Sequence, residues 1–182
     1  MSEDYNTQVD EFLNSIGIPC HRVREACGSF LVNVRITNGE LYYDQLALAS
    51  DMLHEAGHIA IFPPEARSHL SGDLKKAYGV LQALMEASDD ETFHRKAMQT
   101  SDPEATAWAY AAGKHIGLPD DVIIRDEDYD DTGDSIRFGL SLNSYLGING
   151  LHHAGFCTVK SEAYAKICGL PVYPTLAKWL QD

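Results

Sequence analysis

Apolar residues near the amino terminus recur at the spacing of a helix. The positions i, i+3, i+4 and i+7 are occupied by Val9, Phe12, Leu13 and Ile16, and Gly17 follows them. Such spacing gathers apolar side chains on one helical face, and glycine commonly ends a helix. We therefore predict a short amphipathic helix that stops near residue 16.

The next stretch alternates with the period of a strand. Residues 30–36, which begin with Phe30, are alternately apolar and polar, and residues 40–43 follow after the turn signal Asn38-Gly39. Successive side chains of a strand point to opposite faces, and Asn-Gly strongly favours a two-residue turn. The pattern predicts a β-hairpin at the edge of a small sheet.

Helical spacing returns after the hairpin, with capping residues or prolines at several boundaries. The predicted helices cover 45–62, capped by Asp44 and ended by Pro63; 74–85, capped by Asp73; 91–99; and Asp102 to Gly117. Beyond them we expect a late strand over 136–142, an irregular glycine-rich loop over 146–156, and helical segments over 158–168 and 174–181.

These elements predict an α+β, helix-rich fold, with a small sheet or hairpin packed beside the helix over 45–62. A length of 182 residues with 45% hydrophobic content fits one domain spanning 1–182. Within it we expect a core over roughly 5–120 and a helical carboxyl-terminal segment over 156–182.

Composition narrows the class of partner. The formal net charge of −13 disfavours direct binding to nucleic acid or to an anionic membrane. The chain shows no apolar run of about 18 residues and no signal segment, so we expect a cytoplasmic protein. The acidic stretch over 120–134 is expected to be a solvated loop. It does not fit a calcium loop, because Asp131 and Arg137 occupy the glycine and closing acid positions.

One motif carries recognisable chemistry: His54-Glu55-Ala56-Gly57-His58, inside the helix predicted over 45–62. Two imidazoles four residues apart project from one helical face and can converge on one zinc ion. The glutamate between them is then placed to act as the catalytic base on a water molecule. Gly57 is costly inside a helix, which indicates that another segment packs closely against it.

A catalytic zinc site usually has three protein ligands. The metzincin extension needs a glycine at 61 and a histidine at 64, where Ile61 and Pro64 stand. The third ligand is therefore expected to be an acid on a later helix, as in gluzincins, and we predict Glu104. A different role for Glu104 is that of an ordinary first-turn acid that complements the helix dipole.

At this point the chain resembles the ImmA/IrrE-type metallopeptidases, which pair a His-Glu-x-Gly-His helix with a later E-x-E-A-N-x-F-A segment. The resemblance covers roughly residues 5–120. In the second segment, Thr106 replaces the asparagine of the family. The remaining positions match two acids, an alanine, an aromatic residue and an alanine, here Asp102, Glu104, Ala105, Trp108 and Ala109.

The resemblance implies a zincin-like domain and a cytoplasmic regulatory protease that cleaves a protein or peptide, such as a repressor or antitoxin-like regulator. The gap between His58 and Glu104 is longer than the family usually shows, and no helix-turn-helix segment is attached. Asp102, Glu86 and His94 therefore stay open as substitutes for Glu104 in the role of third ligand.

Zinc peptidases also need a hydrogen-bond donor for the oxyanion. Tyr145, His152 and His153 lie in or beside the predicted loop and are the candidates, although loop histidines are often merely exposed to solvent. The leading hypothesis is a zinc endopeptidase whose hairpin edge holds an extended peptide by strand addition. Two further hypotheses are a non-catalytic partner-binding module and a small-molecule metallohydrolase, and the free edge strand would also permit a dimer.

Overall fold

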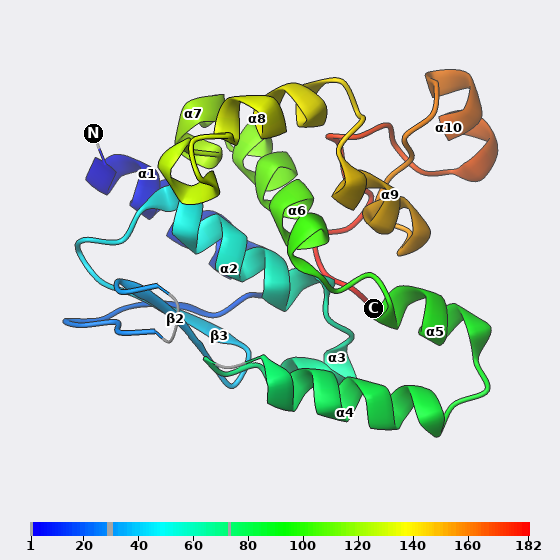
Figure 1. The fold of residues 1–182 in the computed structure, drawn as a ribbon, viewed down its shortest axis with the longest axis horizontal. Helices are drawn as coiled ribbons and strands as arrows, with labels where there is room; N and C mark the ends of the chain where they lie inside the picture. The colour runs from blue at the N-terminus through cyan, green and yellow to red at the C-terminus, as the bar shows by residue number, and fades with distance from the viewer. Residues whose placement is uncertain (1, 29–30, 73) are drawn as a thin grey trace.

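The computed structural model describes residues 2–28, 31–72 and 74–182. This part of the chain confirms the predicted α+β class, because it holds ten α-helices beside a three-stranded mixed sheet (Figure 1). The elements are α1 (Ser2–Ser15), β1 (Cys20–Arg22), β2 (Val34–Thr37), β3 (Glu40–Tyr43), α2 (Ala49–Ile61), α3 (Pro64–Arg67), α4 (Lys75–Glu86), α5 (Glu91–Ala97), α6 (Asp102–His115), α7 (Asp120–Ile123), the 3-10 helix η1 (Glu127–Tyr129), α8 (Gly133–Ser141), α9 (Leu146–His153) and α10 (Glu162–Cys168).

The predicted hairpin is present as β2 and β3, which pair antiparallel. Its turn residues Asn38 and Gly39 have φ angles of 53° and 79°. Positive φ at both turn residues is the requirement that makes Asn-Gly a good hairpin turn. The strand β1 is an addition to the predicted elements; it pairs in parallel with β3 and makes β3 the central strand. Phe30, with which the first predicted strand begins, lies outside the described residues.

Both outer strands of this sheet are already contacted by other segments. On β2, the carbonyl of Ile36 accepts a hydrogen bond of 3.0 Å from the Gly72 amide, and the Gly28 backbone lies against the Val34 carbonyl. On β1, the Asn14 side chain bonds both backbone groups of Cys20. Parts of both edges that could add a peptide strand are therefore already occupied by the protein itself.

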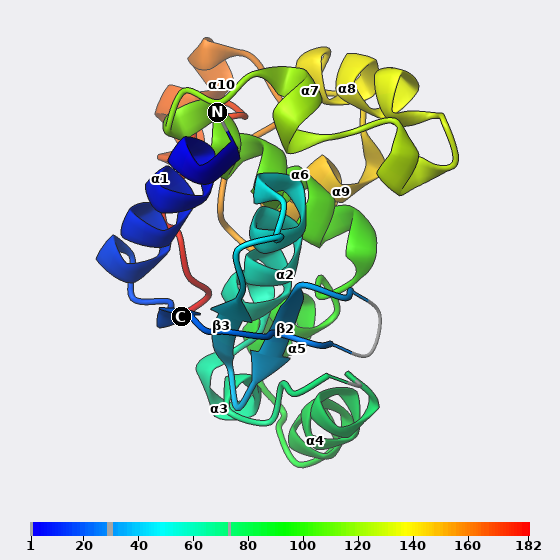
Figure 2. The same ribbon diagram turned by 90° about the vertical axis from the view of Figure 1, so that its left-hand side faces the viewer.

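Helix α2 lies between the sheet and α6, as the two perpendicular views show (Figures 1 and 2). The approach of α2 to α6 is close. A Cβ atom at Gly57 would lie 2.6 Å from the carbonyl oxygen of Ala105, nearer than two such atoms can sit. This contact confirms the prediction that another segment packs against Gly57, and it explains why a helix interior holds a glycine.

The start of α2 differs from the prediction. The helix begins at Ala49, four residues after the predicted start, and Asp44 does not cap it. The Asp44 carboxylate instead accepts hydrogen bonds from the amides of Ala26 and Leu46, at 3.0 Å and 2.9 Å. Asp44 therefore ties two loops together ahead of the helix. Asp73, the predicted cap of the helix over 74–85, lies outside the described residues.

Two segments predicted as strand and loop are helices. Of the alternating apolar residues in α8, Leu140 is fully buried, Ile136 is partly buried and Phe138 is 66% exposed. Helix α9 covers most of the expected loop. Two of its glycines are packing positions: Gly147 lies against the Pro103 carbonyl, and Gly150 lies against the Glu104 side chain. Gly147 and Gly150 therefore mark close helix contact, whereas Gly155, with a φ of 81°, follows the end of the helix.

The carboxyl-terminal segment beyond α10 is not helical over 174–181, in contrast to the prediction. Its backbone bonds to other parts of the molecule. The amide of Gln181 donates to the Ala60 carbonyl at 2.8 Å, and the Trp108 indole donates to the Trp179 carbonyl at 3.0 Å. These bonds hold the end of the chain against α2 and α6 and replace the internal bonds of a helix.

Replacing Gly57 with alanine should destabilise the protein. The added methyl group would collide with the Ala105 carbonyl and push α6 away from α2, so we expect the free energy of unfolding to fall by about 1–3 kcal/mol. Urea denaturation of the Gly57→Ala variant measures this loss.

The matched control is Gly79→Ala in α4, where a Cβ atom would meet no atom within 4 Å. Alanine favours helix over glycine by about 0.8–1 kcal/mol, so this variant should be slightly more stable than wild type. Equal stabilisation by both substitutions would contradict a tight contact between α2 and α6.

Candidate metal centre

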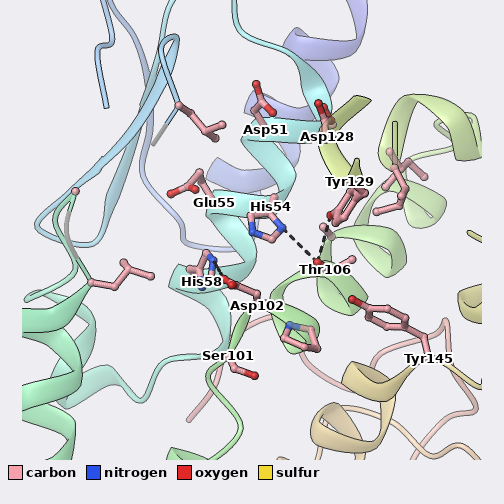
Figure 3. Close-up of a pocket in the computed structure, with 18 of the residues that line it drawn as sticks. Asp51, His54, Glu55, His58, Ser101, Asp102, Thr106, Asp128, Tyr129 and Tyr145 are labelled. Carbon is pink, nitrogen blue, oxygen red and sulfur yellow. Dashed lines mark hydrogen bonds and ion pairs between the residues drawn. The ribbon is translucent and has the colours of Figure 1, made fainter. Parts of the chain in front are cut away.

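Three side chains from α2 and α6 bring potential metal ligands together. One ligand atom from each of His54, His58 and Asp102 lies within 4.8 Å of the other two (Figure 3). The imidazoles come from successive turns of α2, as the motif predicts, and Asp102 is the first residue of α6. Among the described residues this is the group of histidine, cysteine and acidic side chains that could hold a metal ion.

One distance within this group matches that between neighbouring ligands of a tetrahedral zinc ion. The Nε2 atom of His58 lies 3.2 Å from Oδ1 of Asp102. Ligand atoms bound at about 2.0–2.1 Å in a tetrahedron are separated by roughly 3.3 Å. Two nitrogens and one carboxylate oxygen are also a ligand set that zinc commonly takes.

The charge states of the ligands favour a cation. Burial, and then the neighbouring His58, lower the pKa of His54 to about 4. The imidazole is therefore neutral near pH 7 and offers a free lone pair. A hydrogen bond with His58 lowers the pKa of Asp102, so this carboxyl group is ionised under the same conditions.

Glu55 lies beside the group without belonging to it. In Figure 3 its side chain leaves α2 toward the hairpin, whereas the His54 ring points toward α6. Burial raises the pKa of the Glu55 carboxyl, and the nearby His58 opposes that rise. A carboxylate whose pKa rises toward 7 is better matched to general-base catalysis near pH 7.

The group and Glu55 line a cavity of about 760 Å³. The cavity is bounded by Lys75 and Tyr78 of α4 on one side and by Asp128 and Tyr129 of η1 on the other. Its volume falls in the range of roughly 300–1,000 Å³ that is typical of ligand pockets. A substrate in this cavity would contact residues on both sides of the three potential ligands.

Glu104, the predicted third ligand, is placed elsewhere. Its carboxylate bonds the amide and the hydroxyl of Ser101 in a capping box, and the residue is only 7% exposed, with Gly150 packed against it. Asp102 occupies the position beside His58 instead. Positions 102 and 104 differ by about 200° around a helix, so one acid faces the cavity and the other faces α9.

Glu86 and His94 also lie outside the group of potential ligands. Glu86 of α4 accepts a hydrogen bond from Gln82 at 2.9 Å. His94 of α5 lies 2.7 Å from the Ser88 carbonyl through its Nε2 atom. Both residues serve contacts within the segment that connects α2 to α6.

Of the three candidate oxyanion donors, Tyr145 lines the cavity and the two histidines do not. Burial raises the pKa of the Tyr145 phenol above its usual value near 10, and a hydrogen bond with Thr106 opposes the rise, so the phenol is protonated near pH 7 and can donate a hydrogen bond. His152 lies at the end of α9, where its Nδ1 atom is 2.9 Å from the Cys157 carbonyl. His153 is exposed and stacks at an angle on His152.

Two further residues on the cavity wall were missed as site residues. The Thr106 hydroxyl lies 3.4 Å from Nδ1 of His54 and 3.3 Å from the Tyr129 hydroxyl. Burial raises the pKa of Tyr129 to about 12. A signal for Thr106 did exist, because it stands one helical turn after Asp102. Tyr129 lies in the acidic stretch, where the sequence offers no such signal.

Comparisons of the chain with protein-family models, with curated proteins and with solved structures found no match. Among the described residues, no helix is long and apolar enough to cross a bilayer. The interpretation of the cavity therefore depends on its own residues and their geometry.

Asp51 of α2 should make stability depend on pH. Burial, and then the charge of Asp128, raise its pKa to about 6, while Arg125 opposes the rise. The unfolded value is about 3.9, so the folded state favours the protonated acid. This contribution to stability is complete below pH 4 and is lost as the pH rises through 6.

The Asp51→Asn variant removes this loss of stability at rising pH, since asparagine stays uncharged. Relative to wild type, it should gain free energy of unfolding between pH 4.5 and pH 7.5, on the order of 1 kcal/mol after solvent screening. Urea denaturation at the two pH values measures the difference. A gap between the two proteins that does not change with pH would contradict the raised pKa of the partly buried Asp51.

Proposed function

We propose that this chain is a zinc-dependent hydrolase, and specifically a peptidase of the ImmA/IrrE type with a zincin-like fold. One observation carries the proposal. The potential ligand atoms of His54, His58 and Asp102 converge on the wall of a large cavity, and Glu55 lines the same cavity. A purely structural metal site has no use for a carboxylate between its two histidines.

Each ligand has a defined role in this proposal. His54 and His58 would hold the ion through imidazole nitrogens, and Asp102 would supply the carboxylate oxygen in place of Glu104. When bound, zinc would polarise a water molecule and the carbonyl group of the substrate. Three protein ligands leave one coordination position of a tetrahedral ion for these groups.

Glu55 would carry the proton through the reaction. Its carboxylate takes a proton from the attacking water as the water oxygen bonds to the carbonyl carbon of the substrate. It then passes the proton to the amide nitrogen as the carbon–nitrogen bond breaks, which yields a carboxylic acid and an amine. The remaining proton of the acid passes to the amine, so the released products are a carboxylate and an ammonium group. The Tyr145 hydroxyl, which lines the same cavity, is the candidate donor to the oxyanion.

The proposed substrate is a protein or peptide segment, and a repressor or antitoxin-like regulator is the class that the resemblance favours. The size of the cavity supports a peptide substrate, because its lining extends from α4 past the ligand group to η1. With the edge of β2 covered at Val34 and Ile36, the segment would be held mainly by side chains of the cavity.

The Glu55→Gln substitution tests the catalytic role. We expect wild-type protein to hold one zinc ion and to cleave casein or a peptide library. The variant should keep its zinc and lose about 10²–10⁴-fold in rate, since the general base is gone. Metal analysis and product detection by mass spectrometry give the two readouts.

Two other outcomes of that experiment would contradict the peptidase proposal. Zinc binding without turnover by wild type would contradict the peptidase and favour a non-catalytic partner-binding module. Turnover of small amides or esters, with no cleavage of any peptide, would favour a small-molecule metallohydrolase.

A pair of isosteric variants tests the third ligand. Asp102→Asn should weaken zinc binding by at least about 100-fold, because even residues outside the ligand shell contribute 10–100-fold. Glu104→Gln should bind zinc as wild type does, and should lose up to about 1 kcal/mol of stability through its weakened cap. Titration against a chromophoric chelator measures the affinities. A larger loss of zinc affinity in Glu104→Gln than in Asp102→Asn would identify Glu104 as the third ligand.

A further inference from the structure

We propose that Thr106 is a positioning residue for the metal centre: its hydroxyl holds the His54 ring so that Nε2, and not Nδ1, faces the ion. This inference rests on the proposed function, because it assumes that His54 binds metal. It assigns a role to the position at which this chain has threonine and the resembled family has asparagine.

The first support is the contact itself. The Thr106 Oγ1 atom lies 3.4 Å from Nδ1 of His54 (Figure 3). Histidines that bind metals usually donate their other ring N–H to an oxygen, which fixes both the tautomer and the ring orientation. With Nδ1–H directed at Thr106, the lone pair of Nε2 is the one left for a metal.

The second support is the register of the two helices. Asp102 and Thr106 are one turn apart on α6, as His58 and His54 are on α2. Asp102 lies against His58 and Thr106 lies against His54. The same face of α6 therefore provides a ligand for the ion at one turn and a hydrogen-bond partner for a histidine at the next.

The contact between Gly57 and Ala105 explains how a side chain as short as threonine reaches an imidazole on another helix. The backbones meet at these two residues, where a Cβ atom on Gly57 would lie 3.0 Å from the Ala105 Cα atom. Ala105 immediately precedes Thr106, and Gly57 immediately precedes His58. Thr106 is therefore held within range of His54 by backbone packing rather than by a flexible chain.

Tyr129 restrains the threonine from the other side. Its hydroxyl lies 3.3 Å from the Thr106 Oγ1 atom, so the threonine is flanked by a phenol and an imidazole. A threonine hydroxyl has one proton and two lone pairs. It can accept from the His54 Nδ1–H and donate to the Tyr129 oxygen at the same time, so one hydroxyl can serve both neighbours.

A purely structural role would make Thr106 a small residue that fits between α6 and η1. Valine has nearly the same shape as threonine but lacks the hydroxyl, while serine keeps the hydroxyl and lacks the methyl group. The Thr106→Val and Thr106→Ser variants therefore separate hydrogen bonding from packing. Tyr110→Phe is the matched control, because it removes an α6 hydroxyl that bonds Asp120, at 3.1 Å, outside the cavity.

The experiment measures zinc affinity by chelator competition for the full chain and these three variants. We expect Thr106→Val to bind zinc about 10–100-fold more weakly than wild type. Thr106→Ser and Tyr110→Phe should both bind as wild type does. Wild-type affinity in a folded Thr106→Val protein would overturn the inference, as would equal losses in the valine and serine variants.

A second measurement reports on the hydrogen bond directly. In zinc-loaded protein, the Nδ1 proton of His54 should be visible by ¹H–¹⁵N NMR in wild type and in Thr106→Ser, and broadened by solvent exchange in Thr106→Val. An equally persistent signal in the valine variant would overturn the inference. If Thr106→Val fails to fold, Thr106→Ala takes its place with the same expected results.

The two proposals fail in different ways. Wild-type protein that binds no zinc overturns the metallopeptidase and this inference together. Zinc binding and peptide cleavage that survive in Thr106→Val, with unchanged affinity, overturn the positioning role alone.

Discussion

The close contact between Gly57 of α2 and Ala105 of α6 is the constraint on which the rest of the site depends. Without a side chain at residue 57, the two helical backbones approach until a Cβ atom would collide with the Ala105 carbonyl. Short side chains on the facing turns then reach across the interface. Asp102 contacts His58 and Thr106 approaches His54, although neither aspartate nor threonine is long.

The first turn of α6 divides its polar groups between two neighbours. Asp102 faces the cavity, whereas the Glu104 carboxylate caps its own helix with Ser101 and packs under α9. The glycines of α9 make this packing tight, because Gly147 and Gly150 bring that helix onto the same turn. A glutamate held by a cap and covered by another helix stabilises the turn that presents Asp102.

Burial within this arrangement shifts the pKa values of several groups that line the cavity. It lowers the pKa of His54, which leaves the imidazole uncharged near pH 7. It raises the pKa of the Glu55 carboxyl group above its usual value. The same desolvation keeps the phenol of Tyr145 protonated across the cavity. One enclosed space thus shifts the titration of all three groups away from their values in water.

The sequence by itself determined the features that depend on local geometry: the turn at Asn38-Gly39, and the placement of His54, Glu55 and His58 on one helix, since spacing four residues apart is a property of any helix. It also indicated an acidic residue in the first turn of α6, but selected Glu104. Only the tertiary structure decided that Asp102 faces the histidines, that Thr106 and Tyr129 join them, and that the α9 glycines serve packing. Those outcomes depend on which face of one helix meets another, and the side chains that decide it are far apart in the chain.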